Sequence, residues 1–396
     1  MPVWHARTRE AVSSGRLVLL GVIQEQHAER CRLFAQWQGF DWPILHDAAD
    51  LLELTAVPVT TAIDEFGIVR GVGLSPERFE AEFLSKSFAD DAPPAPPPLT
   101  ARANPAQLAE TARRSGAARD WRSLGDQLIT WGGPTHIDEC VDAYSKAVEI
   151  DPKDGSARFR LGVALRMRFD SDHRRADDFQ AAAESWTSSL SLDPNHYIRR
   201  RRIEQYGPRL TKPYPFYDWV DQARREVAAR GERPIELAVE PYGSEIAAPS
   251  RALAKSRPLE IDRDPEGKIA RDRDELVTIE VAVVPARIRP GGAARVHLIL
   301  RPNRSKGAHW NNESTPIRLF IDPAGCVDVS ATTLEAPQPN IAESDEERRF
   351  DFEVQLAADA SGTIDLPAHV LFNACESTGG RCLYLRKDLR IRLVVE

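Results

Sequence analysis

The spacing of apolar residues changes along the chain, and near the N-terminus it predicts a mixed α/β domain. An apolar run from Leu17 to Ile23 has the length and composition of a strand. Two helix-like stretches follow, one from Ala28 to Gln38 and one from Ala48 to Leu54, which begins after Asp47. The pair Val57-Pro58 then introduces an apolar strand that turns at a Gly-containing loop.

A helical spacing replaces this pattern further along, from residue 105 to residue 206. Two passages there share the same order of small, aromatic, small and proline residues, namely Cys140, Tyr144, Ala147 and Pro152 in one and Ala182, Trp186, Ser189 and Pro194 in the other. Small residues let paired helices approach each other, and proline cannot continue a helix interior. The spacing predicts paired helices, flanked by further helices over Pro105 to Arg114 and Trp219 to Arg230.

From about Leu276 the pattern becomes that of strands. The alternation of apolar and polar positions over 348–356 is typical of a half-buried strand. Candidate strands cover residues 277–284, 295–301, 316–322, 348–356, 362–373 and 389–396. Gly and Pro residues separate these strands, and this pattern predicts an antiparallel β-sandwich in the C-terminal part.

These changes of pattern divide the chain into segments. A proline-rich stretch with little to bury forms a stiff linker over residues 89–104. We therefore expect an α/β domain over 1–88, a helical domain over 105–206, a connector over 207–257 with a helix around 218–230, and a β-sandwich over 258–396.

Charge and hydropathy exclude two classes of function. A formal net charge of −8 argues against a general nucleic-acid-binding protein, because phosphate contacts need a basic surface. The run from Arg199 to Arg202 is a local exception, interpreted as a solvated or acid-paired helix face. No apolar run approaches the roughly 18 residues that span a membrane. The N-terminus carries no secretory signal, which predicts a cytoplasmic protein as written and leaves an extracytoplasmic one open if translation starts upstream.

The cysteines are too few and too scattered for a disulfide scaffold. No Cys-x-x-Cys pair occurs, and we expect neither a metal site nor a cofactor. Cys31 is either a peroxidatic or resolving thiol or a packed residue on a helix face, and packing is favoured. Cys375 and Cys382 lie close in sequence, and three interpretations stay open: a redox pair, a structural staple, or two idle thiols.

The order of elements from Leu17 to Arg70 closely resembles the redoxin branch of the thioredoxin superfamily, which also includes the peroxiredoxins. The resemblance implies that Pro58 is a cis-proline and that Val57 and Pro58 line a groove beside a Cys-x-x-Cys motif. In that family the motif ends shortly before a Met-Pro pair, and this chain begins with Met1-Pro2. We therefore expect the first strand and the redox motif to lie upstream, and the sheet to be truncated with apolar edges.

Two further resemblances concern the rest of the chain. The helical passages resemble tetratricopeptide repeats, which implies a protein or peptide partner. The C-terminal strand His369 to Cys375, followed by Cys382, resembles the periplasmic amino-terminal domain of the transmembrane disulfide reductases, and the Lys306 to Trp310 turn in mid-domain adds to the likeness. That likeness implies that Cys375 and Cys382 form the redox pair and exchange disulfides with a partner.

Two functions follow as hypotheses. The first is a thiol–disulfide redox protein of the thioredoxin superfamily with repeats for protein interaction, catalytically incomplete as written and an oxidoreductase if an upstream Cys-x-x-Cys exists. The second is a non-catalytic scaffold in which the thioredoxin-like domain is degenerate and the repeats hold a peptide.

Overall fold

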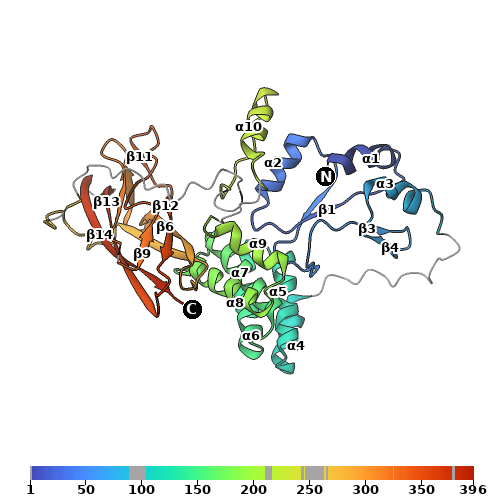
Figure 1. The fold of residues 1–396 in the computed structure, drawn as a ribbon, viewed down its shortest axis with the longest axis horizontal. Helices are drawn as coiled ribbons and strands as arrows, with labels where there is room; N and C mark the ends of the chain where they lie inside the picture. Colours follow the sequence, from blue (N-terminus) through green and yellow to red (C-terminus); the bar gives the residue numbers. More distant parts are fainter. Residues whose placement is uncertain are drawn as a thin grey trace. The chain divides into compact units, whose positions relative to one another are not determined.

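The computed structural model describes residues 2–88, 104–209, 216–241, 245, 263–264, 266–323, 325–376 and 380–396 (Figure 1). Its contacts divide the chain into two compact units. The first contains residues 1–164, 192–202 and 217–240, and the second contains residues 165–191, 203–216 and 241–396. The fold is therefore multidomain, with helices, small sheets in the first unit and an antiparallel β-rich part in the second. The segment boundaries expected from the sequence stay predictions.

The N-terminal part of the first unit holds two separate two-stranded sheets. Its elements are α1 (Pro2–Ser13), β1 (Gly21–Ile23), α2 (Glu29–Gln38), β2 (Ile44–His46), β3 (Thr61–Ile63), β4 (Val69–Val72) and α3 (Pro76–Phe79). Strand β1 pairs in parallel with β2, whereas β3 and β4 form an antiparallel hairpin. A small core joins Ala62 of β3 to Phe79 and Phe83, with Trp4 of α1 and Leu17 packed against it.

The stretch from Ala48 to Leu54 forms turns, so the helix predicted there is wrong. The carboxylate of Asp47 accepts two backbone N–H groups of the following turn, at 2.8 and 3.2 Å. Asp50 and Glu53 have φ values of 52° and 51°, in the left-handed region that an α-helix does not use. Short acidic side chains that bind nearby backbone N–H groups favour turns over helix, which explains the difference.

The helical region predicted from the sequence is confirmed. Its helices are α4 (Pro105–Ser115), α5 (Ala118–Trp131), α6 (Ile137–Ile150), α7 (Gly155–Phe169), α8 (Asp178–Leu192) and α9 (Tyr197–Tyr206). The helix predicted around 218–230 in the connector is α10 (Val220–Ala229). Cys140, Tyr144 and Ala147 of the predicted pattern are all buried on α6. Gly125 of α5 lies so close to the ring of Tyr144 that a Cβ there would be 2.6 Å from a ring carbon. The small residue thus sets the spacing of α5 and α6.

The second unit contains a sandwich of two antiparallel sheets. One sheet has the order β10-β8-β13-β7-β11, with β14 paired to β13, and the other has the order β5-β6-β12-β9. The strands are β5 (Val277–Val284), β6 (Ala293–Pro302), β7 (Ala308–Asn311), β8 (Arg318–Ile321), β9 (Val327–Val329), β10 (Thr333–Glu335), β11 (Glu343–Ser344), β12 (Arg348–Leu356), β13 (Thr363–Glu376) and β14 (Arg381–Val394). Side chains of both sheets, such as Leu298, Phe352 and Phe372, form one core.

The last strand is longer than the sequence predicted. It was expected from residue 389, but β14 begins at Arg381 and pairs with β13 along its whole length. Cys382 therefore lies on a strand and not in a loop. The short strands β7, β9, β10 and β11 were not predicted, because runs of two to four residues carry no readable alternation.

A buried histidine joins the second sheet to the C-terminal end of α9. His297 of β6 places Nδ1 2.7 Å from an oxygen of Asp351 and Nε2 2.8 Å from the carbonyl oxygen of Tyr206. Arg295 binds the other oxygen of Asp351 at 2.8 Å. Burial by itself would raise the pKa of Asp351, but the charge and hydrogen bond of His297, together with Arg295, hold it well below its usual range.

We predict that Gly125→Ala destabilises the first unit, although alanine normally favours a helix interior by about 1 kcal/mol over glycine. The added methyl group would overlap the Tyr144 ring, so α5 and α6 must move apart. Denaturant unfolding, followed by hydrogen exchange of α5 and α6, measures the change. Ser123→Ala, at an exposed position of the same helix, is the control. A gain of stability in Gly125→Ala would contradict the close approach.

We predict that Asp351 contributes stability that acid removes. Because its pKa is lowered in the folded state, the contribution is complete above the ordinary aspartate pKa of about 4 and fades as the pH falls below it. The side chain is 34% exposed, so solvent screens part of the effect. The stability difference between wild type and Asp351→Asn should shrink between pH 6 and pH 3, measured by urea unfolding. The exposed Asp328→Asn variant should show no such trend.

Candidate functional site

The two C-terminal cysteines form a disulfide across the β13–β14 hairpin. Cys375 and Cys382 are directly opposite each other in the strand register, with their Cα atoms 4.0 Å apart. Their surroundings differ, because Cys375 is only 2% exposed whereas Cys382 is exposed. A thiolate from outside thus reaches the sulfur of Cys382 first, and Cys375 is the sulfur that such an attack would release.

A histidine continues the row of the two cysteines across the sheet. His309 of β7 is the register partner of Cys375, and the next pair along, Ala374 and Trp310, is buried in the sandwich core. Because side chains alternate along a strand, Cys375 and His309 share the opposite, outer face. The row therefore crosses β14, β13 and β7. Glu343 of β11 is opposite Asn311, two positions further along β7, and its carboxylate reaches diagonally to within 3.5 Å of His309 Nε2.

The remaining free cysteines lie in settings that disfavour a thiolate. Burial, with a further contribution from the charge of Glu25, raises the pKa of Cys31 to about 11. Burial also raises the pKa of Cys140, whose Sγ lies 3.6 Å from the carbonyl oxygen of Gly125. Cys326 is half-buried and unpaired with another cysteine. Among the described residues, no group of His, Cys, Asp or Glu is placed to hold a metal ion.

The packed side of α2 differs from the expected one. Cys31 was predicted to be on the packed face, whereas the buried residues of this helix are Arg30 and Leu33. Leu33 packs against Tyr217 and against α10, and the guanidinium of Arg30 stacks on the Tyr217 ring at 4.6 Å. An arginine shielded by an aromatic ring and by backbone carbonyls fills a position that hydrophobic spacing assigns to apolar residues.

Val57 and Pro58 lie in the first unit, so the structure does not bring them into one unit with the Cys375–Cys382 pair. The Val57–Pro58 peptide bond is cis, and Val57 is 46% exposed. Other exposed apolar side chains of this unit lie on or next to β1, β3 and β4, namely Val18, Leu20, Val22, Val59, Ile63, Val69 and Val72. Both sequence neighbours of the cis-proline, Val57 and Val59, are thus exposed apolar residues.

Two buried arginines attach the turn segment 47–54 to the helices of the same unit. Arg160 of α7 is 3% exposed and binds both carboxylate oxygens of Asp126 on α5, at 3.1 and 2.9 Å. It also donates to the carbonyl oxygens of Ala49 and Asp50, at 3.4 and 3.3 Å, and to Glu53 at 3.1 Å. One guanidinium therefore satisfies a helix carboxylate and the carbonyls of a turn.

Arg202 of α9 also donates to backbone carbonyl oxygens of this part of the chain. It is 2% exposed and donates to the carbonyl oxygens of Gln24 and Ala48, at 2.7 and 3.1 Å, and to the side chain of Gln26. The run from Arg199 to Arg202 was predicted to be a solvated or acid-paired face. Arg202 is buried and not solvated, and its acceptors include carbonyl oxygens and the Gln26 amide.

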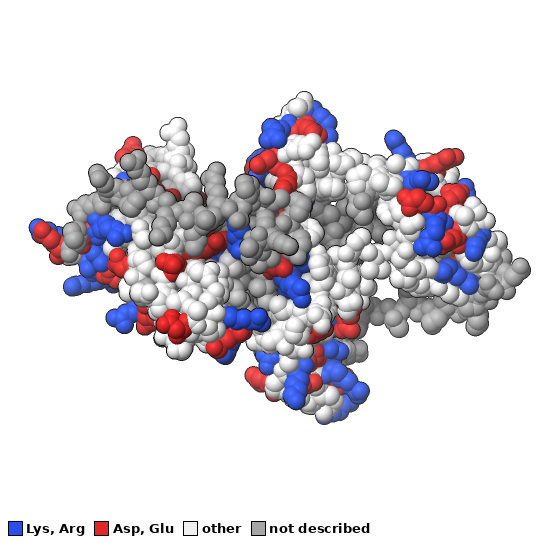
Figure 2. Space-filling model, in the orientation of Figure 1, with Lys and Arg blue, Asp and Glu red and all other residues white. Residues whose placement is uncertain are grey.

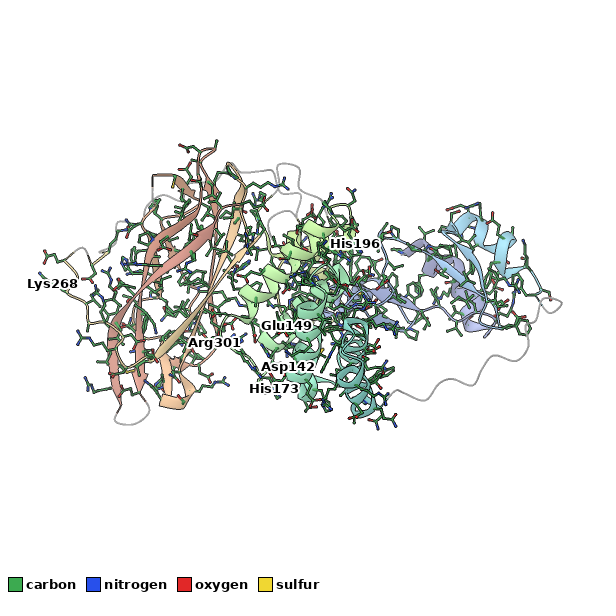
Figure 3. All side chains as sticks on the ribbon, turned by 90° about the horizontal axis from the view of Figure 1, so that it is seen from below. Asp142, Glu149, His173, His196, Lys268 and Arg301 are labelled. Atoms are coloured by element: carbon green, nitrogen blue, oxygen red, sulfur yellow. A yellow bond between two sulfur atoms is a disulfide. The ribbon has the colours of Figure 1, made fainter. Side chains whose placement is uncertain are left out.

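His196 and Asp50 complete this network. His196, labelled in Figure 3, directly precedes α9, and its Nε2 lies 3.8 Å from Asp50. Gln24 donates to the same carboxylate at 2.6 Å, and burial raises the pKa of Asp50. The sequence contained one signal for the network, since Arg160 interrupts an otherwise apolar helix face. The sequence did not indicate which oxygens of the turn would accept hydrogen bonds from Arg160.

The surface charge is mixed. The face drawn in Figure 2 shows acidic and basic side chains interspersed, which agrees with the net charge of −8. Within the described residues, no helix is long and apolar enough to cross a bilayer.

Comparisons with known proteins add no family. No family model matches the sequence, and no curated protein does. One solved structure that matches is that of AvmM, described as catalysing macrocyclization in alchivemycin A biosynthesis. It is 13% identical over 30% of this chain and 89% of its own, with a TM-score of 0.20, and a likeness this weak carries no argument.

We predict that Arg160→Met lowers the free energy of unfolding of the first unit by about 3 kcal/mol, because Asp126 and two carbonyl groups lose their buried partner. The change is measured by denaturant titration with hydrogen exchange of α5 and of residues 47–54. Arg119→Met, whose side chain is 84% exposed, is the matched control and should stay within about 0.5 kcal/mol of wild type. Equal losses in both variants would contradict the network.

Proposed function

We propose that this protein is a thiol–disulfide redox protein of the thioredoxin superfamily, an oxidoreductase whose working disulfide is Cys375–Cys382 and whose helical hairpins are tetratricopeptide-type interaction repeats. The observation that carries the proposal is the asymmetry of the disulfide. One sulfur belongs to an exposed residue at the end of a hairpin, and the other is buried next to a histidine. An exposed disulfide is open to thiol exchange, whereas a structural one is usually shielded.

The exchange needs a dithiol partner as reductant. A partner thiolate attacks Cys382 Sγ, the Cys375–Cys382 bond breaks, and Cys375 leaves as a thiolate. The second partner thiol then attacks the mixed disulfide and releases Cys382, so the partner is oxidised and the hairpin pair is reduced. The reverse sequence passes two electrons to an oxidised partner.

The structural-staple interpretation is less favoured. The two cysteines are separated by 7 positions in sequence, so chain-entropy estimates give such a short loop only about 2–3 kcal/mol. A contribution of this size is ordinary for a structural disulfide, so the preference for redox chemistry rests on the exposure of Cys382.

Two features of the first unit support the family proposal. The parallel pairing of β1 and β2 around α2 and the β3–β4 hairpin after Pro58 follow the redoxin-like order, whereas turns replace its second helix at 47–54. Its cysteines, Cys31 and Cys140, have raised pKa values and make poor nucleophiles. We therefore assign redox chemistry to the hairpin pair.

A second function, a protein-binding scaffold, is favoured by the buried arginines. Arg160 and Arg202 hold a turn of the same chain through its backbone carbonyls, which is how a helical surface binds a peptide without reading its side chains. In this alternative the segment 47–54 is the ligand of the helices, and the disulfide is inert.

Redox titration distinguishes the two functions. We expect the Cys375–Cys382 pair to equilibrate in dithiol buffers between roughly −270 and −120 mV, the range of thiol–disulfide oxidoreductases. Peptide mass spectrometry after acid quench and alkylation reads its state, and insulin reduction with dithiothreitol should be lost in Cys382→Ser. The control Cys326→Ser should behave like wild type, since Cys326 is not in the pair. A pair that stays oxidised below about −300 mV would reject the redox function and favour the scaffold.

A further inference from the structure

We propose that His309, held in place by Glu343, stabilises the thiolate of Cys375 each time the hairpin disulfide opens. The inference rests on the proposed function, because it matters only if the disulfide exchanges. It adds a positioning residue from a different strand to the cysteine pair and explains how a buried sulfur leaves as an anion.

The strand register brings the two residues together. Cys375 pairs with His309 in the ladder between β13 and β7, and directly opposite residues in antiparallel strands have Cα atoms roughly 4.5–5.5 Å apart, with side chains on one face. Strand β7 is itself held by a bond of 2.8 Å from Trp310 Nε1 to the carbonyl oxygen of Glu346. If the pairing register of β7 with β13 shifted by one residue, His309 would point into the core and would no longer lie beside Cys375.

Both ring nitrogens of His309 face acceptors. Nε2 lies 3.5 Å from the Glu343 carboxylate, and Nδ1 lies 3.4 Å from the carbonyl oxygen of Gly307. A neutral imidazole carries one N–H group, so only the protonated ring can donate to both. The side chain of His309 is 19% exposed, whereas that of Glu343 is 68% exposed. Glu343 thus places a carboxylate acceptor at one ring nitrogen of His309, beside the cysteine pair.

The other charged groups near the pair balance one another. Glu376 on β13 and Arg381 on β14 are opposite each other in the register, one position beyond the cysteines. Asp345, next to β11, is bound by Arg304 at 3.1 Å. Within the described residues, His309 is the ionisable side chain paired directly with Cys375 in the ladder of β7.

The chemistry requires such a group. Burial disfavours a charged sulfur, and Cys375 is 2% exposed, so its release as a thiolate is costly unless a positive charge lies next to it. A protonated imidazole supplies that charge when the bond breaks. In the reverse direction the same charge keeps Cys375 ionised for its attack on a mixed disulfide at Cys382.

The test measures exchange against pH in the full chain. We expect His309→Gln to slow reduction of the disulfide by dithiothreitol about tenfold at pH 7, and to move the alkylation profile of Cys375, measured in Cys382→Ser, about one pH unit higher. His309→Lys, which keeps a positive charge, should restore most of the rate. The matched control is His369→Gln. His369 lies on β13, the strand of Cys375, and on the same face, but it is not opposite either cysteine in the register.

The outcomes separate the two proposals. If wild-type protein exchanges but His309→Gln keeps its rate and pH profile, the role of His309 is rejected and the redox function stands. If His309→Lys exchanges as slowly as His309→Gln, the histidine acts through packing and the inference fails. If the wild-type pair does not exchange in any dithiol buffer, the proposed function itself fails.

Discussion

The register of β13 is the constraint on which the C-terminal unit depends. This strand pairs with β14, β8 and β7, so it determines both what enters the sandwich core and what lies on the outer face. Even-numbered positions such as Phe372 and Ala374 are in the core, and Cys375 is therefore outside it, between Cys382 and His309. Because the side-chain period of a strand is two, core packing and the position of the disulfide are fixed together.

The first unit is held together by a different kind of contact. Its N-terminal sheets have two strands each and a small core, which gives little hydrophobic stabilisation of their own. Arg160 and Arg202 add to this by donating to carbonyl oxygens of the turn 47–54 and of Gln24. Buried charges of this kind are stable only when every donor is satisfied, so these contacts fix one arrangement of turn and helices.

The two candidate functions rest on separate parts of the chain. Redox exchange needs the hairpin cysteines and their exposed edge, all within the second unit. Peptide binding needs the buried arginines of the first unit, Arg160 of α7 and Arg202 of α9. Each site is formed by residues of a single unit, so loss of one function leaves the other physically possible. The evidence for redox chemistry is the more specific of the two. A disulfide beside a histidine has fewer structural roles than a buried arginine.

By itself the sequence determined the class of each segment, because helix and strand spacing reflect which face is buried. Strand β5 and helix α2 lie where the pattern placed them, and pairing of Cys375 with Cys382 was common to two of the three open interpretations. Tertiary structure alone decided the turn at 47–54, the burial of Arg202 and the partnership of His309 with Cys375. These depend on acceptors and strands distant in sequence, and local spacing holds no information about which distant group will satisfy a buried charge.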